Sequence, residues 1–171
     1  AYDDARAQNG GISLKYESHF PIAPALKPEV LLEVGFARTT PNEPRDITSW
    51  ARERALSAGV DVVDNRATEV RCFNPEYTFV DKLQTICRRF RQHRDRNEEK
   101  DRPRQFMRHY YDLYKLLELE RVMEFVGTKE YEEYKKDKIR GLDAQEFAAR
   151  TAFRITDDKT YRFFEQEFAS I

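Results

Sequence analysis

Apolar and polar residues alternate in three segments of the first half of the chain, the period-two pattern that is typical of half-buried β-strands. These segments are residues 12–17, 30–36 and 67–73. Prolines between them, in residues 19–28 and 38–46, predict connecting loops. Asp46 and Gly59 are suited to begin and end a short helix over residues 47–58. With a polar loop over residues 1–10, the first 73 residues therefore predict three strands and one short helix.

After Pro75 the apolar spacing changes to about 3.6 residues, which is typical of amphipathic helices. A first helix, beginning at Asn74 or Pro75, is expected to bury Phe79, Val80, Leu83, Ile86, Cys87 and Phe90. After a charged stretch, a second helix is expected to bury Phe106, Tyr110, Leu113, Tyr114 and Leu117. Three more helices are predicted: one around Tyr131 and Tyr134, one over residues 144–153 capped by Asp143, and one around Tyr161, Phe164 and Phe168 that Asp157 or Asp158 begins.

Strands followed by helices predict an α+β fold, with a sheet region over residues 1–73 and a helical bundle over 74–171. The chain has 171 residues, of which 40% are hydrophobic, which is enough for one core. No apolar run exceeds three residues and no signal-peptide pattern is present, so we expect a cytoplasmic protein that does not enter a membrane. Cys72 and Cys87 are expected to be reduced thiols. A net charge of −1 favours no class of partner.

Glu33 stands in the middle of the most apolar predicted strand. Alternation places it on the same face as Leu31 and Gly35. A carboxylate among aliphatic side chains is costly to bury unless it is paired or binds a metal, and Gly35 leaves room beside it for a ligand. Glu33 is therefore either a functional carboxylate or an ordinary residue on a solvated face.

Two further positions carry candidate chemistry on the predicted helices. Lys82 lies at the edge of the first apolar stripe, where its ammonium can reach phosphate oxygens or simply extend into water. Arg108 and Asp112 are four residues apart on the second helix, so they share a face and can pair. This polar stripe is either part of a site or a solvated helix face.

Residues 88–104 contain eight Lys or Arg against four Asp or Glu. This excess could favour a polyanion such as RNA, although the interleaved acidic residues also suit a charged loop. The three histidines and two cysteines show no zinc-ligand spacing, and the sequence has no glycine-rich phosphate loop.

Taken in order, several of these segments resemble a known family. Thr78-Phe-Val-Asp-Lys82-Leu, followed by an Arg-rich stretch and by Arg108-His-Tyr-Tyr-Asp112-Leu-Tyr-Lys-Leu, resembles the C-terminal half of the AbiEii/AbiGii toxins. In that family a TF-x-[ED]-KL helix precedes an RH-x-x-D-[LI]-Y-x-L helix. The segment Leu31–Arg38 resembles the last core strand of the family, and the resemblance extends over about residues 12–119.

The resemblance implies a minimal nucleotidyltransferase domain, with a mixed sheet, joined to a helical bundle. It implies transfer of a nucleotide from Mg²⁺-bound NTP to an RNA acceptor such as tRNA, and a cognate antitoxin as partner. In the implied site, Glu33 is the third metal-binding carboxylate and Lys82 contacts the triphosphate. Asp112 orients Lys82 or the acceptor, and Arg108 steadies Asp112 or contacts phosphate.

The sequence departs from the family pattern before Glu33, because no Gly-Ser turn followed by an Asp-x-Asp strand is present there. We therefore expect the chain to be a piece of a longer enzyme, or a degenerate relative, and to be inactive alone. The alternatives are a non-catalytic module that binds RNA or protein, in which residues 88–104 make the contact, and a purely structural helical interaction domain.

Overall fold

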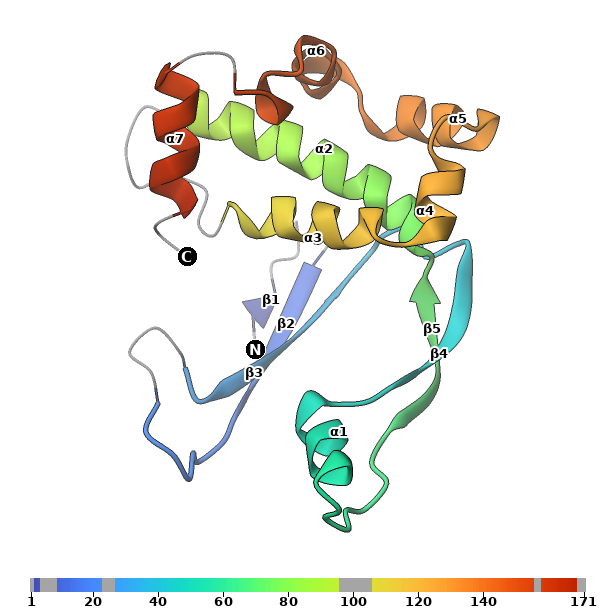
Figure 1. Ribbon diagram of the computed structural model, residues 1–171, viewed down its shortest axis with the longest axis vertical. Helices are drawn as coiled ribbons and strands as arrows, with labels where there is room; N and C mark the ends of the chain where they lie inside the picture. Colours follow the sequence, from blue (N-terminus) through green and yellow to red (C-terminus); the bar gives the residue numbers. More distant parts are fainter. Residues whose placement is uncertain (1, 4–8, 23–26, 96–105, 156–157, 169–171) are drawn as a thin grey trace. The chain divides into compact units, whose positions relative to one another are not determined.

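The structure is a computed structural model that describes residues 2–3, 9–22, 27–95, 106–155 and 158–168 (Figure 1). Strands dominate its first part and helices its second, which confirms the predicted α+β class. The chain divides into two compact units, Ala1–Thr40 and Pro41–Ile171. The change from strands to helices falls at residue 74, as the sequence pattern indicates. The boundary between the two compact units lies earlier in the chain, after residue 40. The domain boundary at residue 73 stays a prediction.

The first unit is an antiparallel sheet with strand order β1-β2-β3. Its strands are β1 (Tyr2–Asp3), β2 (Asn9–Lys15) and β3 (Glu29–Gly35). The two longer strands match the expected segments, but the loop expected over residues 1–10 is partly strand, because Tyr2 and Asp3 pair with Gly11 and Gly10.

The apolar side chains of this sheet are exposed on both faces. Ile12 is 50% exposed on β2, and the neighbours Leu31 and Leu32, which point to opposite faces of β3, are 51% and 53% exposed. The buried hydrophobic side chains of the described residues all lie in the second unit. The first unit is therefore held together by its strand ladder, with no core of its own among the described residues.

The second unit begins with a two-stranded ribbon of β4 (Asn42–Ile47) and β5 (Ala67–Phe73), with α1 (Trp50–Ser57) in the connection. The loop expected over residues 38–46 is present at residues 38–41, but residues 42–46 belong to β4, where Pro44 occupies a paired position opposite Arg71. Proline is tolerated in an edge strand, and both strands of a two-stranded ribbon are edges. Ser49, and not Asp46, caps α1 by accepting a hydrogen bond from the amide of Arg52 at 3.1 Å.

Helix α2 is the longest element, and the helices that follow it in the chain, α3 to α7, pack around it, whereas α1 lies in the β4–β5 connection (Figure 1). Asn74 precedes it and Pro75 is its first residue, as the sequence predicts, and all six apolar residues of the expected stripe are buried. The remaining elements are α3 (Arg108–Leu117), α4 (Glu120–Phe125), α5 (Lys129–Lys138), α6 (Gly141–Ala149), the 3-10 helix η2 (Thr151–Phe153) and α7 (Asp158–Phe168), after α2 (Pro75–Arg94).

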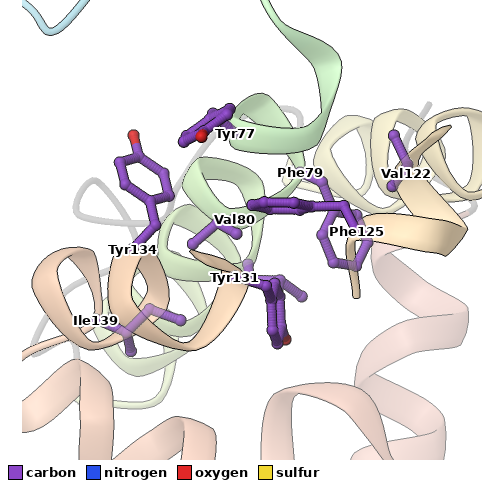
Figure 2. Close-up of a cluster of buried hydrophobic side chains, with 9 residues drawn as sticks. Tyr77, Phe79, Val80, Val122, Phe125, Tyr131, Tyr134 and Ile139 are labelled. Carbon is purple, nitrogen blue, oxygen red and sulfur yellow. The ribbon is translucent and has the colours of Figure 1, made fainter. Parts of the chain in front are cut away.

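A first core cluster fills the space between the N-terminal half of α2 and helices α4 and α5. Its buried members are Tyr77, Phe79, Val80, Leu83, Val122, Phe125, Tyr131, Tyr134 and Ile139. Figure 2 shows these side chains converging from the three helices and the residue after α5. The rings of Tyr77 and Tyr134 meet edge to face, with their centroids 4.8 Å apart. Aromatic packing therefore fixes the first half of α2 in place.

A second cluster surrounds the C-terminal half of α2, where Ile86 and Phe90 pack with Phe106 and Ala152. Tyr110 packs against this cluster and donates its hydroxyl hydrogen to the Ala152 carbonyl at 2.7 Å. The stripe expected for α3 is only partly correct. Tyr114 is 60% exposed and Leu117 is 40% exposed, whereas Leu116 packs against the first cluster.

Two helices differ from the sequence-based expectation. Helix α4 was not predicted, since its six residues are too few to show a clear period. Helix α6 begins at Gly141 instead of residue 144, so Asp143 lies inside the first turn, where it is buried. The helices expected around Tyr131 and around Tyr161 are confirmed as α5 and α7. Within the described ranges, no helix combines the length and apolar composition needed to cross a membrane.

Candidate functional site

Lys82 and Asp112 meet where α3 packs beside α2. The ammonium of Lys82 donates to the Oδ2 atom of Asp112 at 2.5 Å. The side chains are 29% and 39% exposed, so both remain open to solvent on one side. The helix–helix packing that buries Leu83 and Leu113 brings the two charges together, because each charge lies beside the apolar stripe of its own helix. The structure thus joins two of the sequence-predicted site residues.

Arg108 lies one turn before Asp112 on α3 and is exposed. The sequence suggested that Arg108 could pair with Asp112 on the same helix. In the structure, Lys82 on the neighbouring helix α2 forms an ion pair with Asp112. The positive charge of Arg108 nevertheless acts on the same site, since it is one of the charges that reach the imidazole of His109.

His109 lies between these charges and is only 9% exposed. Its Nδ1 atom is buried and has no hydrogen-bond partner in the part of the chain that the structure describes. Burial, together with the nearby positive charges of Lys82 and Arg108, lowers the pKa of the imidazole to about 4, and the negative charge of Asp112 offsets only part of this effect. His109 is consequently neutral at pH 7 and has one ring nitrogen available for a hydrogen bond.

Arg89 is the fourth charged residue around this imidazole, and its positive charge also lowers the pKa of His109. It follows Lys82 by seven residues on α2, which is close to two helical turns, so the two cations share a helix edge. The guanidinium of Arg89 donates to the amide oxygen of Gln92 at 3.3 Å. Within the part of the chain that the structure describes, Arg89 makes no ion pair.

Among the described residues, three cations and one carboxylate act on His109. Lys82 and Arg89 come from α2, and Arg108 and the carboxylate of Asp112 come from α3. An excess of positive charge at a partly exposed helix junction favours an anionic ligand. Lysine supplies a point charge and arginine a planar fork of donors, and both kinds of side chain bind phosphate oxygens in proteins. Chemically, the arrangement suits a phosphorylated ligand.

Glu33 lies on β3 in the first unit, exposed and opposite Gly11 in the strand ladder. Gly11 has no side chain, so the sheet face next to Glu33 stays open on the side of β2. Among the described residues, no group of three or more His, Cys, Asp or Glu side chains is placed to hold a metal ion. The described residues therefore do not form a complete metal site, and Glu33 can contribute at most one ligand to such a site.

The basic segment over residues 88–104 is only partly described, since residues 96–105 lie outside the described ranges. Two of its arginines are committed to acidic residues of α6. Arg91 donates to Asp143 at 2.9 Å, and Arg94 donates to Glu146 at 2.6 Å. Asp143 also accepts a hydrogen bond from Gln84 at 2.7 Å. These contacts attach α6 to α2, so Arg91 and Arg94 have a structural role in the bundle.

Sequence reasoning missed His109 and Arg89 as members of the site. His109 follows Arg108 directly, and a lone histidine carries no signal without spacing to other ligands. Arg89 was grouped with the basic segment, although its distance of seven residues from Lys82 is a sign that both lie on one helix edge. That spacing could have identified Arg89 before the structure was known.

Comparison with known proteins gives one match. A family model described as "Nucleotidyl transferase AbiEii toxin, Type IV TA system" matches residues 1–170, which is nearly the whole chain. No curated protein and no solved structure matches the chain.

Proposed function

Because the chain belongs to the AbiEii family of nucleotidyl transferase toxins of type IV toxin–antitoxin systems, we propose that its α2–α3 site binds the triphosphate of an NTP during nucleotide transfer to an RNA acceptor such as tRNA. The contact between Lys82 and Asp112 carries this proposal. It joins the two sequence motifs by which the chain resembles the family, at a place where positive charge exceeds negative charge.

In this function Lys82 binds phosphate oxygens and stabilises the negative charge that develops during phosphoryl transfer. The protein contributes mainly by positioning and by electrostatics in such reactions, so a correctly held ammonium has a large effect on rate. Asp112 holds the flexible Lys82 side chain in one position through the 2.5 Å contact. Arg108, exposed one turn away on α3, is proposed to contact phosphate as well.

We further propose that Glu33 supplies one carboxylate ligand for Mg²⁺. This metal is commonly held by one or two carboxylates together with substrate phosphates and water, and it neutralises charge on the reacting phosphate when bound. The remaining ligands would come from the nucleotide or from groups outside the described residues. A cognate antitoxin is the protein partner expected for a toxin of this family.

The test is nucleotide transfer by the full-length protein with labelled ATP, CTP, GTP and UTP in turn and total tRNA as acceptor. Lys82→Ala and Asp112→Ala are each expected to lower the rate at least about 100-fold, the usual cost of losing a charge-stabilising group. Lys129→Ala removes a lysine that is 90% exposed on α5 and should have no effect. Unchanged far-UV circular dichroism would show that the variants are folded. Transfer that survives Lys82→Ala would refute the assigned role.

A further inference from the structure

We propose that Arg89 is a second phosphate-binding residue of this site, which extends it along α2 from Lys82 toward the C-terminal end of the helix. The ligand is a chain of phosphate groups, either the triphosphate of the nucleotide or the phosphodiester backbone of the acceptor RNA. This inference rests on the function proposed above for the same site.

The helix geometry places Arg89 and Lys82 on one edge of α2. Seven residues correspond to about 10.5 Å along the axis and to a rotation of only about 20° from two full turns. The apolar residues between them, Leu83 and Ile86, face the core, so both charged side chains leave the helix beside α3. Two cations at this separation can act on different phosphate groups of one extended ligand.

On α2, Arg88 and Arg89 have no carboxylate partner among the described residues, and of these two only Arg89 is partly buried. Arg91, Arg94 and Arg121 all donate to carboxylates, the last to Glu76 at 2.8 Å. Arg89 has only the 3.3 Å contact with a neutral amide among the described residues. An external anion would stabilise the charge of a partly buried arginine that has no carboxylate among the described residues and lies near other cations.

His109 gives a second and independent indication that something binds here. It is nine-tenths buried, yet its Nδ1 atom has no hydrogen-bond partner among the described residues. A buried polar atom without a hydrogen bond costs about 1–3 kcal/mol, and structures usually provide a partner such as water or a ligand. The charges of both Lys82 and Arg89 act on this imidazole, so it lies within electrostatic reach of both proposed phosphate-binding residues.

Binding measurements on the full-length protein test the proposal. The probes are inorganic tripolyphosphate, each of the four NTPs, and poly(U) RNA. Arg89→Gln is compared with Arg162→Gln, which removes an exposed arginine from α7 in the same unit and changes the net charge equally. A lost charge-assisted hydrogen bond corresponds to about tenfold weaker binding or more. Arg89→Lys, which keeps the charge but not the planar fork, should fall between wild type and Arg89→Gln.

The two sources of phosphate give different results. If Arg89 contacts the nucleotide, Arg89→Gln weakens tripolyphosphate and NTP binding about tenfold and leaves poly(U) binding unchanged. If it contacts RNA, NTP binding is unchanged, poly(U) binding weakens, and the slope of log K against log salt concentration decreases by about 0.7, one contact on a single strand. The proposal would be overturned if Arg89→Gln bound every probe as tightly as the wild type. It would also be overturned if Arg162→Gln lost as much affinity for the probes as Arg89→Gln.

These outcomes are separate from those of the proposed function. If Lys82→Ala abolishes transfer but Arg89→Gln binds phosphate ligands normally, the proposed nucleotidyltransferase function stands and only the role of Arg89 is refuted. Absence of transfer in the wild type, together with weakened phosphate binding in Arg89→Gln, would leave a phosphate site without the proposed chemistry.

Discussion

The ammonium of Lys82 and the carboxylate of Asp112 lie 2.5 Å apart, although 30 residues separate them in the chain. A pair that is this exposed to solvent contributes at most about 1 kcal/mol to stability. The pair therefore matters little for stability, and we expect its main effect to be the positioning of the Lys82 ammonium. If Asp112 acts only by holding Lys82, the two residues form one functional unit.

A double-mutant cycle tests this unit. We expect Lys82→Ala, Asp112→Ala and the double variant to lower kcat/KM for nucleotide transfer by similar factors, because losing either member disables the other. The melting temperature of each variant, measured in parallel, should decrease by only a few degrees, as expected for a pair worth about 1 kcal/mol. Losses that multiply in the double variant would instead mean that Asp112 acts directly on the acceptor.

His109 makes stability depend on pH in a defined window. Its pKa is lowered from 6.5 to about 4 in the folded chain by burial and by nearby positive charges, so the unfolded chain binds the proton more tightly between these values. The stabilisation is fully present above about pH 6.5 and is lost as pH falls toward 4, by roughly 3 kcal/mol in total. His109→Gln should remove this part of the pH dependence of the free energy of unfolding, measured by urea titration at each pH. If wild type and variant differ in free energy of unfolding by the same amount at pH 7 and at pH 4.5, the prediction is contradicted.

The contacts of Asp143 should matter for stability and not for chemistry. Its carboxylate, 12% exposed, accepts hydrogen bonds from both Gln84 and Arg91. Asp143→Ala leaves these donors without a partner, and we expect the free energy of unfolding to decrease by about 1–3 kcal/mol. Glu132→Ala removes a 56% exposed carboxylate on α5 and should change the free energy by less than about 1 kcal/mol. Equal effects in urea titrations of the two variants would argue against a structural role for Asp143.

Cys87 should be unreactive in the folded chain. Burial, with help from the negative charges of Glu146 and Asp143, raises the pKa of its thiol to about 12. The thiolate is the reactive form, so at pH 8 a thiol reagent such as DTNB should label Cys72, which is half-buried, and not Cys87. Both thiols should react in denaturant, and Cys72→Ser should abolish labelling of the native chain. Two fast-reacting thiols before denaturation would show that the surroundings of Cys87 on α2 are open to solvent.

Glu33→Gln tests the proposed metal ligand. We expect transfer by the full-length variant to decrease more than about tenfold and to need a higher Mg²⁺ concentration for half-maximal rate, because one anionic oxygen ligand is lost. Glu29→Gln is the matched control, since Glu29 lies on the same strand but accepts a hydrogen bond from Ser13 at 2.7 Å. The same Mg²⁺ dependence in Glu33→Gln and wild type would exclude Glu33 from the metal site.

The sequence predicted those elements whose local pattern and tertiary surroundings agree. The α2 stripe is clear because one face of a long helix is buried along its whole length, and β5 lies where the alternation predicts it. The β4 strand was missed because Pro44 indicates a turn locally, whereas pairing with Arg71 on a ribbon edge tolerates it. Asp143 was read as a helix cap because capping is the local use of aspartate, but ion pairing with Arg91 on α2 gives it a buried position.

The sequence by itself determined the change from strands to helices near residue 74, the core face of α2, and the motifs around Lys82 and Asp112 that indicate the family. These depend on spacing along the chain, which a sequence states directly. Only the tertiary structure decided that Asp112 pairs with Lys82, and that His109 lies buried within reach of Arg89's charge. Contacts between helices depend on packing angles and on which side of each apolar stripe faces its neighbour. Residues far apart in the chain come together only when that packing forms.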